Sequence, residues 1–89
     1  MTAKTRKIIF NQKFREDLKW WYKKDKLKAE KILDLIESAT ENPFQGLGKP
    51  EPLKYIGSGV WSRRITGEHR LVYRVTDKFI EFLQARYHY

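Results

Sequence analysis

A proline-rich segment in the middle of the chain divides it into two halves with different patterns. The segment 42–52, NPFQGLGKPEP, contains all three prolines of the sequence and two of its five glycines. Proline lacks the amide hydrogen that a helix interior needs, and it also interrupts the ladder of a central strand. The segment is therefore predicted to be a long loop, and loops of this length in a compact domain are either functional or disordered.

Helical periodicity dominates before this segment. Apolar residues recur at the spacing of one helix face in two stretches, 12–24 and 26–40. Asn11 and Asp25 precede these stretches and are predicted N-caps, because their side-chain oxygens can accept hydrogen bonds from free amides of the first turn. The run RKIIF, residues 6–10, is predicted to be a strand. The first half thus predicts one strand followed by a helical hairpin.

Strand patterns dominate after the proline-rich segment. Strands are predicted at 53–56, 60–65, 70–75 and 79–89, with a turn at 57–59. The resulting order, βααββββ, is typical of an α+β domain with a mostly antiparallel sheet. No internal repeat or linker is visible, so residues 1–89 are expected to form a single domain, with 1–5 as a flexible extension.

Side-chain alternation predicts a cationic face on this sheet, because successive side chains of a strand point to opposite faces. The larger apolar sets are expected to pack beneath the helices: Trp61, Ile65, Leu71, Tyr73 and Val75. Arg64, Arg70 and Arg74 then lie together on the opposite face. If the alternation continues along the last strand, Arg86 and His88 join them. The alternative is an ordinary solvated face that binds nothing.

The charge balance favours an anionic partner. Nineteen Lys and Arg oppose eleven Asp and Glu, which gives a net charge of +8. Such a surface is expected for a protein that binds nucleic acid, but a merely basic surface, an acidic protein partner and an anionic membrane are alternatives. Three Trp, five Tyr and five Phe favour nucleic acid, because bases stack on aromatic rings.

Several classes of protein are disfavoured by what the sequence lacks. Cysteine is absent, which excludes disulfides and thiolate chemistry and suits a reducing compartment. The two histidines are not spaced like metal ligands. The apolar run 8–10 is too short for a signal-peptide core, and no stretch is long enough to span a bilayer. We therefore expect a cytoplasmic protein that needs no metal, cofactor or membrane.

Cleavage of RNA is a reaction that this set of residues can perform without a metal. RNA supplies its own nucleophile, the 2′-hydroxyl, so the protein needs a proton acceptor, a proton donor and positive charge near the phosphate. Glu51 is the candidate acceptor, His88 the candidate donor and Arg70 the candidate phosphate ligand. Each has a plainer alternative: an exposed loop carboxylate, a frayed terminal residue and surface charge.

Three further residues are candidates for substrate binding. Arg64 offers a second guanidinium, Lys54 offers an ammonium group, and Tyr89 can orient the phosphate or stack on a base. For Tyr89 the alternative is a packed terminal ring. His69, in the turn before the strand 70–75, is interpreted as a structural or surface residue.

Four blocks of sequence resemble a known family. They are GKPEPL at 48–53, SGVWSRRI at 58–65, EHRLVY at 68–73 and ARYHY at 85–89. These blocks and their spacing resemble the YoeB toxins, a branch of the RelE-like toxins of bacterial toxin–antitoxin pairs. The resemblance is close over 43–89 and looser over 6–42. Position 85 is alanine where the family often has cysteine, a difference that touches no candidate site residue.

The resemblance implies a small RelE-like fold and a ribosome-dependent endonuclease that cuts mRNA in the A site. Glu51 would be the general base, Arg70 the transition-state clamp and His88 the general acid, with Arg64 and Tyr89 supporting the phosphate. The implied partners are mRNA, the 70S ribosome and a YefM-like antitoxin with an acidic C-terminal segment, and a homodimer is left open. The alternatives are a non-catalytic RelE/ParE-like toxin that blocks a protein target, and a structural ribosome-binding protein.

Overall fold

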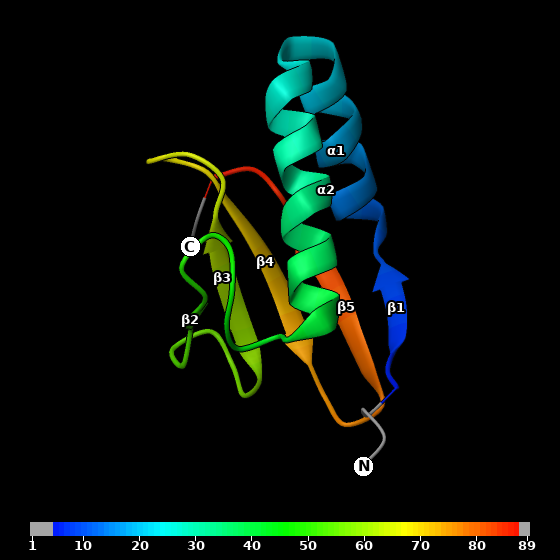
Figure 1. Cartoon of the computed structure of the whole chain (residues 1–89), viewed down its shortest axis with the longest axis vertical. Helices are drawn as coiled ribbons and strands as arrows, with labels where there is room; N and C mark the ends of the chain where they lie inside the picture. Colours follow the sequence, from blue (N-terminus) through cyan, green and yellow to red (C-terminus); the bar gives the residue numbers. More distant parts are fainter. Residues whose placement is uncertain (1–4, 88–89) are drawn as a thin grey trace.

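Two helices cover one face of a five-stranded sheet in the computed structural model, which describes residues 5–87 (Figure 1). The elements in chain order are β1 (Lys7–Phe10), α1 (Gln12–Lys24), α2 (Lys26–Glu41), β2 (Glu51–Pro52), β3 (Val60–Arg64), β4 (Arg70–Val75) and β5 (Phe79–Gln84). The α+β fold class is confirmed, and both helices lie within one residue of their predicted limits. Among residues 5–87, no helix is long and apolar enough to cross a membrane.

The helical hairpin begins and turns at the two predicted caps. The Asn11 Oδ1 accepts a hydrogen bond of 2.9 Å from the amide of Phe14, in the first turn of α1. Asp25 ends α1 by donating its amide to the Trp21 carbonyl at 2.7 Å. The Asp25 Oδ1 then accepts from the Lys28 amide at 3.3 Å and so caps α2. A single residue therefore satisfies backbone groups of both helices, which keeps the hairpin connection short.

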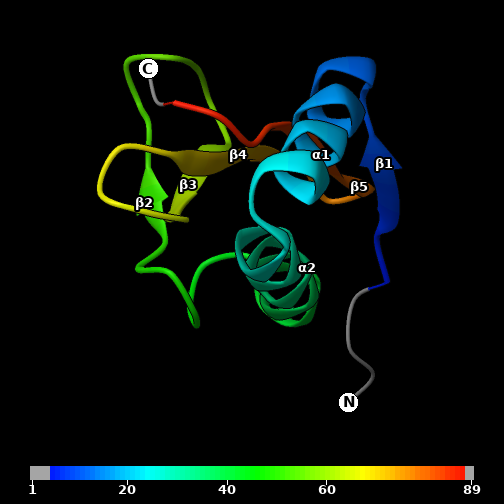
Figure 2. The ribbon, with the colours of Figure 1, turned by 90° about the horizontal axis from the view of Figure 1, so that it is seen from above.

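The sheet order β1-β5-β4-β3-β2 places the first and the last strand next to each other. β1 runs parallel to β5, and every other neighbouring pair is antiparallel. After β5 the chain crosses the end of β4 toward β2, as the red segment shows in two perpendicular views (Figures 1 and 2). Segments distant in the sequence are thereby gathered at one end of the strands β2, β3 and β4.

The predicted alternation of side chains in β3 and β4 is confirmed. The face beneath the helices carries buried or partly buried apolar residues of the main core: Trp61, Ile65, Leu71, Tyr73 and Val75. They pack with α1 and α2 residues such as Phe14, Ile32 and Leu35. The opposite face holds a smaller apolar cluster of Leu53, Val60 and Val72, next to Ser62 and the arginines. This second face therefore combines buried apolar residues with arginines, of which Arg64 and Arg70 face each other at one end of the strands and Arg74 stands opposite Val60 at the other.

The predicted strand at 53–56 is wrong, and a shorter strand precedes it. Glu51 and Pro52 pair with Ser62 and Trp61 of β3, whereas residues 54–56 form a turn that the Ile56 amide closes on the Leu53 carbonyl at 3.0 Å. β2 lies at the edge of the sheet, where proline is tolerated because its missing amide is needed by no further strand. The predicted loop 42–52 therefore ends in a strand.

The predicted strand 79–89 is also wrong over residues 85–87, because β5 ends at Gln84. Side chains of α1, and not a neighbouring strand, bind the backbone of Ala85. The Asp17 Oδ2 accepts from the Ala85 amide at 2.9 Å, and the Trp21 Nε1 donates to the Ala85 carbonyl at 2.7 Å. The alternation consequently stops, and the Arg86 guanidinium lies 3.9 Å above the Trp20 ring instead of joining the cationic face. His88, which the same alternation placed on that face, lies outside the described residues.

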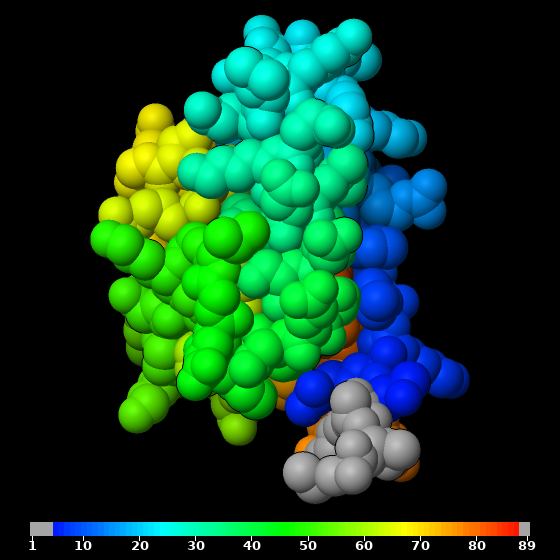
Figure 3. Space-filling model, in the orientation of Figure 1, coloured from blue at the N-terminus to red at the C-terminus, as the bar shows by residue number. Residues whose placement is uncertain are grey.

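Arg63 is fully buried and holds the proline-rich loop against the sheet. Its guanidinium donates five hydrogen bonds of 2.6–3.0 Å to Tyr73 Oη, Ser38 Oγ and the carbonyls of Leu47, Asn42 and Gln45. A guanidinium has five N–H groups, so its donor capacity is used completely. In the space-filling view the loop packs beside α2 (Figure 3). Arg63 thus fixes the path of the chain that leads to β2.

Tyr73 joins this network and should make it sensitive to alkaline pH. Its hydroxyl accepts from Arg63 and donates to the Pro43 carbonyl at 2.6 Å. Burial raises the pKa of Tyr73 above its ordinary value of 10.0, and the hydrogen bond and charge of Arg63 oppose this shift. Above about pH 10 the unfolded chain therefore releases the phenol proton before the folded chain does, and stability falls as the pH rises.

We expect Tyr73→Phe to lower the free energy of unfolding by about 1–3 kcal/mol at pH 7, because a buried donor and a buried acceptor lose their partner. The difference from the native protein should shrink as the pH rises above about 10, since only the native protein loses the contribution of Tyr73. Urea unfolding between pH 7 and 11 measures both effects, with the exposed Tyr22→Phe as control. A constant difference across this range would contradict the assignment.

Candidate active site

The sheet brings Glu51 and Arg70 together from positions nineteen residues apart in sequence. The Glu51 Oε1 lies 3.7 Å from the Arg70 Nη1, and the same nitrogen donates to the Ser62 Oγ at 3.3 Å. The three residues come from β2, β4 and β3, which are neighbouring strands. The predicted meeting of the loop carboxylate with an arginine is therefore present in the structure.

The ion pair between Glu51 and Arg70 contributes little to the stability of the fold. The Glu51 side chain is 59% exposed and the Arg70 side chain 20% exposed. Because water and mobile ions screen the exposed Glu51 carboxylate, the pair should contribute no more than the roughly 0–1 kcal/mol of a surface ion pair. The separation of 3.7 Å is also longer than the 2.7–2.9 Å typical of a charge-assisted hydrogen bond. Arg70 is consequently free to bind an anionic ligand at small cost to the fold.

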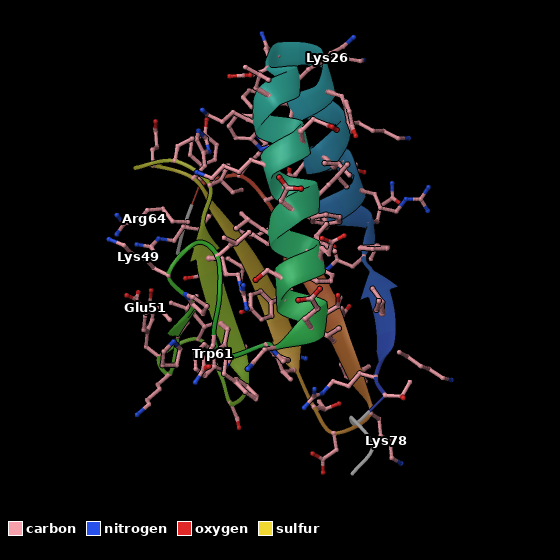
Figure 4. The ribbon with its side chains drawn as sticks, in the orientation of Figure 1. Lys26, Lys49, Glu51, Trp61, Arg64 and Lys78 are labelled. Carbon is pink, nitrogen blue, oxygen red and sulfur yellow. The ribbon has the colours of Figure 1, made fainter. Side chains whose placement is uncertain are left out.

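Arg64 adds positive charge at the same edge. It stands directly opposite Arg70 in the antiparallel register of β3 and β4. Like charges that face each other across strands are unfavourable unless an anion lies between them. Figure 4 shows Arg64 and Lys49 next to each other on the same side of the molecule as Glu51, and both line a surface hollow beside α2. This edge of the sheet is therefore electrostatically suited to phosphate.

A glycine permits the loop to reach this edge. Gly48 has φ of 81°, in the left-handed region, and its carbonyl accepts a hydrogen bond from the Arg64 amide at 2.7 Å. A Cβ at this position would come within 2.7 Å of the Leu35 side chain. The close approach of the loop to β3, which leads the chain to Glu51, thus depends on a residue without a side chain.

Lys54 is not brought to the Glu51–Arg70 pair. It lies in the turn after β2 and lines a separate hollow with Pro52, Gly59 and Trp61. Its suggested part in substrate binding stays a prediction, and it concerns a surface next to the pair rather than the pair itself.

The C-terminal segment is anchored beside Arg70. The Arg70 amide donates to the Tyr87 carbonyl at 2.9 Å, and the Tyr87 amide donates to the His69 Nδ1 at 2.8 Å. The last described residue of the tail therefore lies next to the residue that pairs with Glu51. His88 and Tyr89, the other two predicted site residues of this segment, lie outside the described residues.

Sequence reasoning missed the residues that direct the tail to this place. Asp17 is buried although it is acidic, and it binds both the Lys13 ammonium at 2.8 Å and the Ala85 amide. A signal was available, because Asp17 falls on the apolar face of α1 between Phe14 and Trp21 at helical spacing. His69, interpreted as structural or surface, does have a structural contact through its Nδ1. Within residues 5–87, no group of three or more His, Asp or Glu side chains is placed to hold a metal ion.

Comparison with known proteins decides the family. The family described as "YoeB-like toxin of bacterial type II toxin-antitoxin system" matches residues 10–89. This chain belongs to that family. The resemblance predicted from the four sequence blocks is therefore confirmed, and the chain is a YoeB-like toxin of a toxin–antitoxin pair.

Individual relatives agree in sequence and in fold. "Toxin YoeB" of Escherichia coli (strain K12) is 49% identical over 83 residues, which cover 93% of this chain and 99% of the relative. A YoeB dimer from Staphylococcus aureus superposes with a TM-score of 0.84 at 42% identity, over 96% of this chain and 99% of that one. A YoeB–YefM complex from the same species gives 0.79 at 41% identity, over 94% and 98%.

Proposed function

We propose that this toxin cleaves mRNA in the A site of the 70S ribosome, without a metal ion, and so inhibits translation. The observation that carries the proposal is the convergence of the Glu51 carboxylate, the Arg70 guanidinium and the C-terminal segment at one edge of the sheet. The family gives the toxin role, and the chemistry of these groups suggests how it acts. Residues 1–89 would act as one toxin domain.

The proposed reaction uses the 2′-hydroxyl of the RNA as nucleophile. Glu51 accepts the 2′ proton, and the 2′-oxygen forms a bond to the adjacent phosphorus as the bond from phosphorus to the 5′-oxygen breaks. His88 donates a proton to that leaving oxygen. The products are a fragment that ends in a 2′,3′-cyclic phosphate and a fragment that begins with a 5′-hydroxyl. Holding the 2′-oxygen in line makes the attack intramolecular.

Arg70 would stabilise the charge that grows on the phosphoryl oxygens. A planar guanidinium donates two parallel hydrogen bonds to such oxygens, which a lysine cannot do. Its present contacts, 3.7 Å to Glu51 and 3.3 Å to Ser62, are long enough to be exchanged for phosphate. Arg64, opposite Arg70, would bind the same or the adjoining phosphate.

Lys54 and Tyr89 are assigned to the surroundings of the reacting groups, and the position of His88 in the chain supports its role as the acid. Lys54 would contact RNA beside the cleaved bond, from the hollow that it shares with Trp61. Tyr89 would orient the phosphate or stack on a base. His88 is the residue after Tyr87, and the Tyr87 carbonyl accepts a hydrogen bond from the Arg70 amide. This connection to Arg70 supports the assignment of His88 as the general acid.

We further propose that a YefM-like antitoxin neutralises this toxin and that the free toxin can dimerise. The relatives from Staphylococcus aureus, one solved with YefM and one as a dimer, support both assignments. An acidic antitoxin segment would complement the net charge of +8.

End-group analysis of cleaved mRNA tests the reaction. Translating ribosomes incubated with the toxin should yield a 5′-hydroxyl fragment and a cyclic or 3′ phosphate. The variant His88→Ala should cut about 10²–10⁴-fold more slowly, which is the usual contribution of a general acid. Ribosomes themselves need Mg²⁺, so the metal requirement is measured on free RNA in EDTA at high toxin concentration.

Two outcomes would contradict the proposal. A 5′-phosphate end, or a strict need for added Mg²⁺ on free RNA, would reject attack by the 2′-hydroxyl. If folded His88→Ala remained as toxic to cells as the native protein, a toxin that blocks a protein target would be favoured instead.

A further inference from the structure

His69 stands where three parts of the fold meet: the turn before β4, helix α1 and the C-terminal segment. Its ring packs edge-on against Trp21, with 5.0 Å between ring centroids, and lies 4.8 Å from the Tyr87 ring. Only 12% of its side chain is exposed. The backbone beneath it is fixed as well, because its amide donates to the Thr66 Oγ1 at 3.0 Å and its carbonyl accepts from the Ile65 amide at 2.9 Å.

The hydrogen bond from the Tyr87 amide identifies which nitrogen of this ring is the acceptor. An amide N–H can only donate, so the His69 Nδ1, 2.8 Å away, must offer a lone pair. The neutral ring then carries its hydrogen on Nε2, which lies 3.9 Å from the exposed Glu68 carboxylate. A doubly protonated ring has no acceptor and would lose the bond to Tyr87.

The backbone amide and the backbone carbonyl of Tyr87 are therefore bound by two consecutive residues, His69 and Arg70. The His69 Nδ1 accepts from the Tyr87 amide, and the Arg70 amide donates to the Tyr87 carbonyl at 2.9 Å. Tyr87 has φ of 60°, in the left-handed region that residues other than glycine seldom adopt. A backbone in that conformation relaxes unless its surroundings hold it. Of the two bonds, only the one to His69 comes from a side chain and can be removed by substitution.

We propose that His69 is a positioning residue, whose unprotonated Nδ1 fixes the direction in which the chain leaves Tyr87 toward His88. This inference rests on the proposed function, because it assigns His69 a part in presenting the general acid. Asp17 and Trp21 hold Ala85, two residues before Tyr87, so the tail has one anchor on α1 and a second on the turn before β4. In this role His69 acts through Tyr87 rather than on the RNA itself.

Two substitutions separate the acceptor of His69 from its ring. His69→Phe keeps an aromatic ring among Trp21 and Tyr87 but offers no acceptor. His69→Asn places an oxygen the same number of bonds from Cα as Nδ1, and it gives up the ring. We expect His69→Phe to lower kcat for ribosome-dependent cleavage by about 10–100-fold, the usual effect of losing a supporting hydrogen bond, with KM nearly unchanged. His69→Asn should recover most of the loss.

Two NMR measurements on the full chain provide readouts that do not depend on activity. In the ¹⁵N-histidine spectrum of the native protein at neutral pH, the Nδ1 of His69 should be the unprotonated nitrogen. Hydrogen exchange of the Tyr87 amide should be slow in the native protein and in His69→Asn, and fast in His69→Phe. A hydrogen on Nδ1, or equal protection of Tyr87 in both variants, would overturn the inference.

The outcomes distinguish this inference from the proposed function. If the native toxin cleaves no mRNA, the proposed function fails whatever the variants do. If the native toxin cleaves and folded His69→Phe cleaves equally fast, the positioning role of His69 fails while the proposed function stands. Slow cleavage by His69→Phe with recovery in His69→Asn supports both.

Discussion

Replacing Arg70 with alanine should slow mRNA cleavage by about 10²–10³-fold, the effect that loss of one donor to a developing oxyanion has in other enzymes. The expected cause is the loss of the guanidinium that faces Glu51, since the substitution leaves the Arg70 amide, and its hydrogen bond to Tyr87, in place. Because Glu51 is exposed and lies 3.7 Å from the guanidinium, loss of the ion pair should change the unfolding free energy by no more than about 1 kcal/mol. Single-turnover cleavage on programmed ribosomes and urea unfolding measure the two quantities.

Arg74→Ala is the matched control for this substitution. Arg74 lies on the same strand and the same face as Arg70, and it is exposed, but it stands opposite Val60 and Glu81 rather than Arg64. Arg74→Ala therefore removes the same charge from the toxin and leaves Glu51, Arg64 and Arg70 unchanged. Near-native cleavage by Arg74→Ala, with a large loss in Arg70→Ala, would identify a specific role. Equal losses in both would mean that only the overall positive charge matters.

The parts of the fold that were predictable from sequence are those decided by neighbouring residues. Asn11 and Asp25 mark the helix starts because the cap and the amide that it binds lie three residues apart. The alternation in β3 and β4 could be followed because strand geometry fixes side-chain direction over a few residues. The same alternation correctly set Arg70 apart from the core residues Leu71 and Tyr73.

The errors arise where distant residues compete for the backbone. Glu51 and Pro52 form a strand only because β3 offers a partner, and no local pattern marks a two-residue strand that contains proline. β5 ends early because Asp17 and Trp21 bind Ala85, more than sixty residues away in sequence. An extrapolated alternation cannot detect such a competitor, which explains the misplacement of Arg86.

For the candidate site, the sequence predicted which groups belong together but not what holds them there. Chemical need and the family resemblance grouped Glu51 with Arg70, whereas the strand pairing that places Glu51 beside β3 was not predicted. The supporting contacts of Tyr87 with His69 and Arg70 involve backbone groups, which have no sequence signature. The same is true of the three loop carbonyls that bind Arg63.

Arg63→Ala should lower the free energy of unfolding by about 3–5 kcal/mol, as breaking a buried polar network does. The substitution leaves three carbonyls, the Ser38 hydroxyl and the Tyr73 hydroxyl without the donor that each now has. It also opens a void between α2 and β3, because Arg63 is fully buried. For a domain of this size the loss is a large part of the total stability. Urea unfolding at neutral pH measures it.

The neighbouring arginine supplies the control and shows what decides the effect. Arg64→Ala removes the same side chain one position along β3, but Arg64 is exposed, so stability should change by less than about 0.5 kcal/mol. Arg63→Lys keeps the charge and provides three donors for five acceptors, so it should fall between Arg63→Ala and the native protein. If Arg63→Ala were as stable as Arg64→Ala, the buried hydrogen bonds would not hold the loop. Because that loop leads to Glu51, Arg63→Lys should also reduce cleavage, whereas Tyr22→Phe should not.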